Sequence, residues 1–242
     1  MSNDVRVKKL QEELIPLSAT EILSRIQDEF GPKVAFASSL GIEDQVITHH
    51  ISNLVPRMKI FTLDTGRLFA ETYDLMEKTE SRYGIRIEVY TPESSETESM
   101  VREHGINLFY QSIENRKLCC SIRKLRPLKR ALAGLDGWVC GLRRGQGVTR
   151  QDVTLVEWDS ANALLKFNPL WNWTEQDVRD FVEQHNIPYN PLHDQGFVSI
   201  GCSCCTRAIK PGEDQRAGRW WWESPEHKEC GLHLRDGKLV QT

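Results

Sequence analysis

The sequence contains no hydrophobic run long enough to cross a bilayer, which requires about 20 consecutive apolar residues. It also lacks an apolar stretch at its start. Met1 to Pro16 mixes acidic and basic side chains, unlike a secretory signal. We therefore expect a cytoplasmic protein with no membrane partner.

Internal repeats, low-complexity segments and a strong excess of one charge are absent too. The 242 residues are 39% hydrophobic and 27% charged, with a formal net charge of −3, as in an ordinary globular enzyme. Because the chain is acidic and has no basic tail, nucleic acid is not an expected partner. One stretch departs from this balance: Arg116 to Arg130 contains seven Lys or Arg residues and no acidic one. Its position beside a cysteine motif favours a small anionic ligand.

Seven cysteines are present, and five of them fall in three places. Thiols stay reduced in the cytoplasm, so metal binding or catalysis explains them better than disulfides. The first two places are the adjacent Cys119 and Cys120 and the C-x-x-C pair Cys202 and Cys205. Neighbouring residues on a helix point about 100° apart, which suits ligands to separate irons better than ligands to one tetrahedral zinc. An iron–sulfur cluster is therefore favoured over zinc.

The remaining cysteines differ in their surroundings. Cys230 stands near Lys228 and His233, which can stabilise its thiolate, so it is the candidate nucleophile, on a segment expected to close over the site. Read alone, a cysteine in a tail is usually inert. Cys204 is a spare or alternative metal ligand, and Cys140, in an apolar strand, is expected to be a buried structural thiol.

Short β-type runs alternate with helical stretches along most of the chain. Strands are predicted at residues 33–37, 58–63, 85–90 and 137–142, and helices at 42–53, 68–83, 120–133 and 174–185. Thr174 is the predicted cap of the last helix, and Pro127 should interrupt the third. The alternation predicts an α/β fold with a mostly parallel sheet flanked by helices. Residues 1–205 would form this domain, and 206–242 an irregular C-terminal segment that carries the nucleophile.

Two loops at predicted strand ends are candidates for nucleotide binding. The first opens a helix, whose N-terminal N–H groups can bind phosphate or sulfate, although it lacks the Gly-Lys-Ser/Thr end of a Walker A loop. Its candidate residues are Ser38, Ser39, Leu40, Gly41 and Asp44. Those of the second loop are Leu63, Asp64, Thr65, Gly66 and Arg67. Either loop alone is equally well explained by a turn with a helix cap, but adjacent strand ends would place the two side by side, which favours a nucleotide site.

Basic side chains near these motifs are candidates for binding an oxyanion, because guanidinium groups bind phosphate and sulfate through several hydrogen bonds at once. The candidates are Lys124, Arg143, Arg144, Arg150, Arg216 and Arg219. A single arginine is usually a surface charge, whereas this group predicts an oxyanion pocket.

In this order, the motifs resemble those of the sulfonucleotide reductases, in particular the iron–sulfur type that reduces adenosine 5′-phosphosulfate (APS). The matching motifs, from Ser38 to His233, are Ser-Ser-Leu-Gly-Ile-Glu-Asp, Leu-Asp-Thr-Gly-Arg, Cys-Cys followed by Lys124, Gly-Leu-Arg-Arg-x-Gln, Ile-Gly-Cys-x-x-Cys-Thr-Arg and Glu-Cys-Gly-Leu-His. The family commonly has Pro at the position of Cys204. This difference bears on cluster chemistry or stability but leaves the four ligand positions intact.

The resemblance implies an adenine-nucleotide α-hydrolase-like fold, related to the PP-loop proteins, with the nucleotide at Ser38 to Asp44. It implies a [4Fe-4S] cluster that does not itself pass electrons to the substrate. The ligands of that cluster would be Cys119, Cys120, Cys202 and Cys205. The resemblance also implies an S-sulfocysteine intermediate on Cys230, with His233 helping to set the thiolate. No thioredoxin-like domain is expected in the chain, so a separate thioredoxin is the expected electron donor.

Three alternatives stay open. The substrate could be 3′-phosphoadenosine 5′-phosphosulfate (PAPS), alone or together with APS, because a few pocket residues decide whether the 3′-phosphate is accepted. The fold could serve an ATP pyrophosphatase or adenylyltransferase, although their Ser-Gly-Gly-x-Asp loop is missing and Cys230 would have no role. A zinc or iron–sulfur redox sensor would leave the nucleotide-type loops unexplained. The sequence also leaves open whether the protein is a homo-oligomer.

Overall fold

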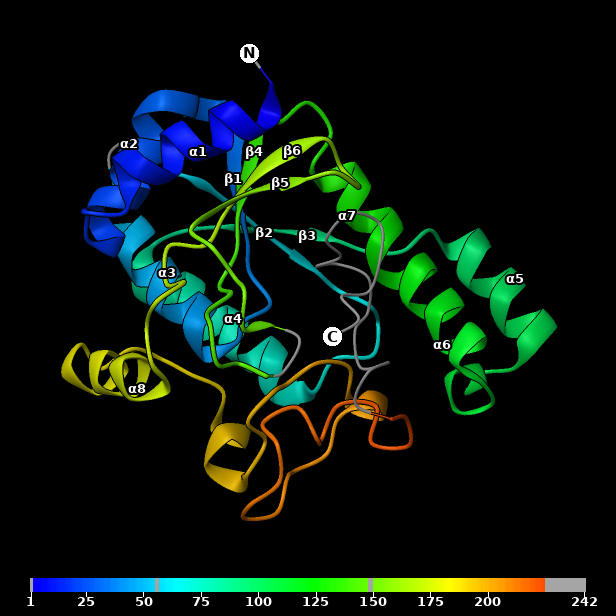
Figure 1. Ribbon diagram of the computed structural model, residues 1–242. Helices are drawn as coiled ribbons and strands as arrows, with labels where there is room; N and C mark the ends of the chain where they lie inside the picture. The colour runs from blue at the N-terminus through cyan, green and yellow to red at the C-terminus, as the bar shows by residue number, and fades with distance from the viewer. Residues whose placement is uncertain (1, 55–56, 148–149, 225–242) are drawn as a thin grey trace.

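A computed structural model describes residues 2–54, 57–147 and 150–224 (Figure 1). Its centre is a six-stranded sheet with the strand order β3-β2-β1-β4-β6-β5. The strands are β1 (Val34–Ala37), β2 (Lys59–Leu63), β3 (Ile87–Tyr90), β4 (Gly137–Val139), β5 (Val156–Asp159) and β6 (Leu164–Phe167). Neighbouring strands are parallel except β5 and β6, which are antiparallel. The predicted mostly parallel sheet is therefore confirmed, and β5 and β6 extend it beyond the four predicted strands.

The central strands are buried on both faces, and their alternating side chains divide the core in two. Phe36 of β1 is in register with Ile60 and Val139, and these three side chains belong to one apolar cluster. Ala35 and Trp138, which point the other way, belong to a second cluster. The sheet thus separates two apolar layers, each of which needs helices to cover it.

Helices supply that cover on both faces (Figure 1). Their bounds are α1 (Asn3–Leu14), α2 (Ala19–Phe30), α3 (Ile42–Ser52), α4 (Ala70–Tyr83), α5 (Ser94–His104), α6 (Ile113–Cys120), α7 (Arg126–Ala131) and α8 (Glu175–Gln184). Buried side chains of α2, α3 and α8 join the first apolar cluster, and those of α7 join the second. No described helix is long and apolar enough to cross a membrane.

Local sequence signals explain how several helices begin. Thr174 and Asp177 form a capping box at the start of α8, as the sequence predicts. Ser18 and Glu21 form another at the start of α2, a helix not predicted from the sequence. These reciprocal bonds satisfy N–H groups that have no partner inside the helix.

The region around the adjacent cysteines differs from the predicted single helix at 120–133. Helix α6 ends at Cys120, a π-helical turn spans Ser121–Leu125, and α7 begins at Arg126. Pro127 lies in the first turn of α7, directly after the π-helical turn, and having no N–H it cannot donate to a carbonyl of that turn. The predicted interruption is therefore confirmed, but Cys119 and Cys120 lie at the end of a helix rather than at its start.

The segment after α8 crosses the carboxyl ends of the strands and contains turns and short 3-10 helices (yellow to orange in Figure 1). An isolated bridge pairs Thr206 with Arg219, and Trp220 is only 1% exposed, so this segment is anchored to the rest of the protein at these residues. The proposed division at residue 205 stays a prediction.

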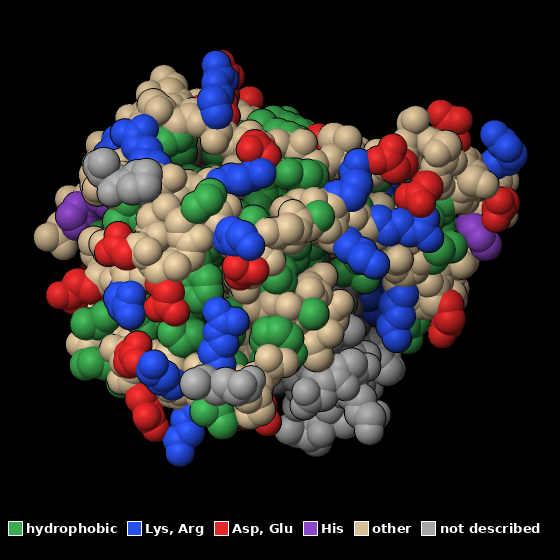
Figure 2. Space-filling view, turned by 90° about the horizontal axis from the view of Figure 1, so that it is seen from above, with side chains coloured by type: hydrophobic (Ala, Val, Ile, Leu, Met, Phe, Trp, Pro, Cys, Tyr) green, Lys and Arg blue, Asp and Glu red, His purple; other side chains and the backbone are tan. Residues whose placement is uncertain are grey.

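Surface charge is mixed on the face seen in Figure 2, where Lys and Arg side chains alternate with Asp and Glu. Exposed ion pairs of the molecule include Arg25 with Glu29 and Lys33 with Asp136. Exposed pairs of this kind contribute little to stability. Several other basic residues, among them Lys124, Arg143 and Arg219, instead line cavities.

Candidate functional site

The loop after β1 is shaped by a buried carboxylate. Both the backbone N–H and the hydroxyl of Ser39 donate to Asp44 Oδ2, each at 2.6 Å. Burial raises the pKa of Asp44 to about 6, against the lowering effect of the Ser39 hydrogen bonds. Gly41 precedes α3 and provides no side-chain cap, so the first N–H groups of that helix are available to an anion.

This loop opens onto a cavity of about 210 Å³ at the carboxyl ends of β1, β2 and β4, here called the nucleotide cavity. It lies where ligands bind in open parallel sheets. Of the candidate residues, the cavity brings together Ser38, Ser39, Gly41, Asp44, Leu63, Lys124, Arg143, Arg150, Arg216 and Arg219. Leu40 does not line it, because its side chain is buried in the first apolar cluster.

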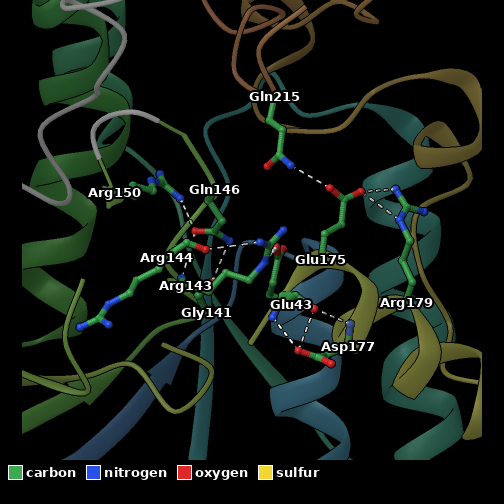
Figure 3. Close-up of polar contacts among 11 residues, drawn as sticks. Glu43, Gly141, Arg143, Arg144, Gln146, Arg150, Glu175, Asp177, Arg179 and Gln215 are labelled. Carbon is green, nitrogen blue, oxygen red and sulfur yellow. Dashed lines mark hydrogen bonds and ion pairs between the residues drawn. The ribbon is translucent and has the colours of Figure 1, made fainter. Parts of the chain in front are cut away.

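Arg143 forms one wall of the nucleotide cavity (Figure 3). Its Nε donates to Glu43 at 2.8 Å, and its backbone N–H donates to Gln146 Oε1 at 3.2 Å. The same Gln146 oxygen accepts from Arg150 Nη1 at 2.8 Å. Arg144 points away in Figure 3, since its Nε donates to the Val153 carbonyl at 2.9 Å. Of the two adjacent arginines, the structure therefore places only Arg143 in the cavity.

The loop after β2 lies mostly outside the nucleotide cavity. Asp64 accepts from Gly66 N and from the Tyr73 hydroxyl, at 2.7 and 2.8 Å. Thr65 Oγ1 lies 3.2 Å from Cys202 Sγ. None of residues 64–67 lines the nucleotide cavity, whereas Arg67 lines a second, smaller one. Of the second loop, only Leu63 joins the first loop in lining the nucleotide cavity, as predicted. Thr65 and Arg67 instead lie beside the cysteines.

That second cavity, of about 20 Å³ and here called the cysteine cavity, gathers thiols from two distant segments. Cys119 and Cys120 come from the end of α6, and Cys202, Cys204 and Cys205 from the 3-10 turn Ser203–Cys205 and the residue before it. The basic residues around it are Arg67, Arg116, Arg123, Lys124 and Arg219. The four candidate ligands therefore lie together in a setting that can compensate negative charge.

Burial raises the pKa of the Cys119 thiol, and the positive charge of Arg123 opposes this effect. The Sγ atoms of Cys204 and Cys205 are 3.8 Å apart. Among the described residues, no three Cys, His, Asp or Glu side chains converge closely enough to hold a single ion. The five thiols that line this cavity are soft ligands of the kind that bind zinc or iron–sulfur clusters.

Cys140 is buried, as the sequence predicts, and its Sγ donates to Asn168 Oδ1 at 3.0 Å. Burial raises its pKa to about 12, so the thiol stays protonated at neutral pH. Although it lines the nucleotide cavity, it is a poor nucleophile, since the thiolate is the reactive form.

The two cavities meet at three residues, Lys124, Arg219 and Trp220, which line both. Several residues of the nucleotide cavity were not among the candidates predicted from the sequence, for example Glu43, Gln146 and His193. His193 is buried, and burial lowers its pKa. Two of them stood inside quoted motifs: Glu43 in Ser-Ser-Leu-Gly-Ile-Glu-Asp and Gln146 in Gly-Leu-Arg-Arg-x-Gln. Cys230 and His233, the candidate nucleophile and its neighbour, lie outside the described residues.

Comparison with solved structures defines the class of fold. A crystal structure of PAPS reductase from Candida auris, in a phosphate complex, matches with a TM-score of 0.72 at 29% identity, over 84% of this chain and 96% of that one. An FMN adenylyltransferase from Candida glabrata matches with a TM-score of 0.55 at 15% identity, over 98% and 78%, and this likeness concerns the fold alone. The protein is an α/β protein of the PP-loop-like class.

Sequence comparison then identifies the family. A family model described as the phosphoadenosine phosphosulfate reductase domain matches residues 33–208. A protein of Allochromatium vinosum named adenosine 5′-phosphosulfate reductase is 53% identical, over 90% of this chain and 85% of that protein. One of Burkholderia cepacia with the same name is 52% identical, over 84% and 81%. The chain therefore belongs to the phosphoadenosine phosphosulfate reductase family and is an oxidoreductase, which confirms the family expected from its motifs.

Proposed function

We propose that this protein reduces APS to sulfite and AMP in sulfate assimilation. The names of its relatives support the substrate. The observation that carries the proposal is the junction of the two cavities, where Lys124 and Arg219 face both the nucleotide cavity and the thiols. The junction places positive charges that would hold the phosphate and sulfate of the nucleotide next to the thiols proposed for the cluster, whereas the attacking thiol, Cys230, lies outside the described residues.

In this proposal the nucleotide lies across the strand ends, with its anionic part toward the basic residues. The N–H groups at the start of α3 and the guanidinium of Arg143 provide donors on one side. Lys124, Arg216 and Arg219 provide positive charge on the other. Their charges would stabilise the phosphate of AMP as it leaves, which is the point where negative charge develops.

The proposed chemistry has two displacements at sulfur. The Cys230 thiolate attacks the sulfur of APS, an S–S bond forms, and the bond between that sulfur and the phosphate oxygen breaks as AMP leaves. A thioredoxin thiolate then attacks Cys230 Sγ, and sulfite departs with the electron pair of the S–S bond. The second thioredoxin thiol closes the disulfide of thioredoxin and restores the Cys230 thiol, so the dithiol supplies both electrons.

A [4Fe-4S] cluster is the cofactor we propose for the cysteine cavity. Cys119, Cys120, Cys202 and Cys205 would hold it, and Cys204 is the additional thiol at its edge. When bound, the cluster supplies a charged group beside Lys124 and Arg219, and no transfer of its electrons to the substrate is expected. Thr65 and Arg123 support the cavity wall, since Arg123 Nη1 donates to the Thr65 carbonyl at 2.7 Å.

The test is the mass of the intact protein, purified anaerobically and incubated with APS in the absence of reductant. We expect one added sulfo group, which is absent in Cys230→Ser and is removed by reduced thioredoxin with release of sulfite. PAPS in a parallel sample decides between the two nucleotides. Failure of both nucleotides to form an adduct, with the iron content verified, would contradict the proposal.

A further inference from the structure

A buried ion pair lies beside the junction of the two cavities. Arg116 donates from Nε and Nη2 to the two carboxylate oxygens of Glu223, at 2.9 and 2.7 Å. The side chains are 0% and 2% exposed. Arg116 lies on α6, about one turn before Cys119 and Cys120. The pair therefore joins the last described part of the chain to the helix that carries two of the thiols.

Trp220 links this ion pair to the junction. The Glu223 N–H donates to the Trp220 carbonyl at 2.8 Å, which closes a turn, and the Trp220 N–H donates to the Cys205 carbonyl at 3.1 Å. Trp220 has a φ of 39°, a left-handed conformation that is unfavourable for a residue with a Cβ. Such a conformation persists only where surrounding contacts hold it, and the Arg116–Glu223 pair is one of these contacts.

Both Arg116 and Arg219 pack on the Trp220 ring, with guanidinium carbons 4.9 and 4.7 Å from its centroid. The charge of Arg116 is neutralised by Glu223, whereas Arg219 has no carboxylate partner among residues 2–54, 57–147 and 150–224. Its Nη1 lies 3.5 Å from Ser199 Oγ and 3.4 Å from the Ile200 carbonyl, which are long hydrogen bonds. Packing on Trp220 therefore decides where this guanidinium lies.

A second packing contact fixes the other side of Arg219. A Cβ on Gly201 would fall 2.3 Å from Arg219 Nη2, so the guanidinium occupies the space that the glycine leaves. Between Gly201 and Trp220, the Arg219 side chain lines the nucleotide cavity, and no carboxylate of the described part of the chain pairs with it.

We propose that the Arg116–Glu223 pair is a positioning device for Arg219. The pair fixes the turn Trp220–Glu223 against α6 and so holds the Trp220 ring in place. The ring in turn supports the Arg219 guanidinium where it contacts the phosphate of the bound nucleotide. This inference rests on the proposed function for the identity of the nucleotide. It adds two residues, Arg116 and Glu223, that contact no part of the nucleotide cavity and act through Arg219.

The experiment compares the affinities for AMP and for adenosine by calorimetry, since their ratio isolates the contribution of the phosphate. Glu223→Gln removes the charge of the carboxylate and is expected to weaken AMP binding about 10-fold while adenosine binding changes less than about 2-fold. Arg219→Gln should have a similar effect, and the double variant should bind AMP no more weakly than Arg219→Gln alone. Arg116→Lys, which keeps the charge but loses the two-pronged contact, should cause a smaller loss.

The matched control is Glu157→Gln, which breaks another buried ion pair, with Lys166 at 3.2 Å, outside both cavities. It should lower the melting temperature without changing the ratio of affinities. Additive losses in the double variant, equal losses for AMP and adenosine, or unchanged AMP binding in both Glu223→Gln and Arg116→Lys would overturn the positioning role. The proposed function is judged separately: wild-type protein that binds AMP but forms no sulfo adduct contradicts the reductase chemistry and leaves the positioning of Arg219 standing.

Discussion

Replacement of Gly141 by alanine should disrupt the nucleotide cavity through the buried Asp44. Gly141 follows β4, and a Cβ there would lie 2.2 Å from Asp44 Oδ1 and 3.3 Å from its Cγ, far inside ordinary contact distance. Asp44 cannot turn away freely, because its other oxygen accepts two hydrogen bonds from Ser39 at 2.6 Å. The added methyl group must therefore displace either β4 or the Ser38–Asp44 loop.

The size of the effect follows from these two costs. Overpacking a dense interior costs about 1–3 kcal/mol, and loss of one hydrogen bond to a charged group costs about 1.5–3 kcal/mol. We expect the free energy of unfolding to fall by about 3–5 kcal/mol, which for a chain of this size lowers the melting temperature by roughly 10 °C. Since the same loop borders the nucleotide cavity, the affinity for AMP should fall about 10- to 100-fold, as expected for a displaced binding loop.

Thermal unfolding and calorimetric titration with AMP measure the two effects. Gly134→Ala is the control: its φ of 80° makes alanine unfavourable, but no atom lies within 4 Å of the added Cβ. It should cost about 1–2 kcal/mol of stability and leave AMP binding unchanged, because Gly134 precedes β4 and lies at the amino ends of the strands, whereas the nucleotide cavity lies at their carboxyl ends. If Gly141→Ala bound AMP as the wild type does, the account of Asp44 as the residue that shapes the loop would be refuted.

Three further predictions concern separate parts of the molecule. Burial lowers the pKa of His50 to about 4, below the value of about 6.5 in the unfolded chain. The stability that neutral His50 contributes is therefore complete above pH 6.5 and falls by up to about 3 kcal/mol as the pH falls toward 4. Urea unfolding at pH 6.5 and at pH 4 should show that the free energy of unfolding decreases less in His50→Gln than in the wild type. Iron analysis of anaerobically purified protein should show loss of the cluster in Cys202→Ser and retention in Cys204→Ser; retention in both would remove Cys202 from the ligand set. Arg143→Gln should weaken AMP binding about 10-fold, whereas Arg144→Gln, whose side chain lies outside the nucleotide cavity, should change it less than about 2-fold; equal effects would contradict that placement.

Local patterns explain why part of the sheet could be predicted and part could not. The runs that became β1, β2, β3 and β4 are short, rich in apolar residues and separated by longer helical stretches, so their composition and order identify them. Strands β5 and β6 carry Glu157 and Lys166, which are hidden by pairing with each other across the two strands. The sequence around each of these charged residues does not indicate that it is buried, because its burial depends on a partner in another strand.

The sequence by itself determined which chemistry is possible: the residue types and spacing of Cys119, Cys120, Cys202 and Cys205, and a polar loop at the end of a buried strand. These are local properties, because the angle between neighbouring side chains on a helix and the position where a strand ends depend on residues a few positions apart.

Only the tertiary structure decided how these parts meet. The contacts of Arg143 with Glu43, of Arg116 with Glu223 and of Thr65 with Cys202 join residues 100, 107 and 137 positions apart. Such contacts depend on how the sheet, α6 and the segment after α8 pack together, and no local period encodes that packing. For the same reason, the separation of Arg143 from Arg144 and the sharing of Lys124 and Arg219 between the two cavities emerged only from the folded chain.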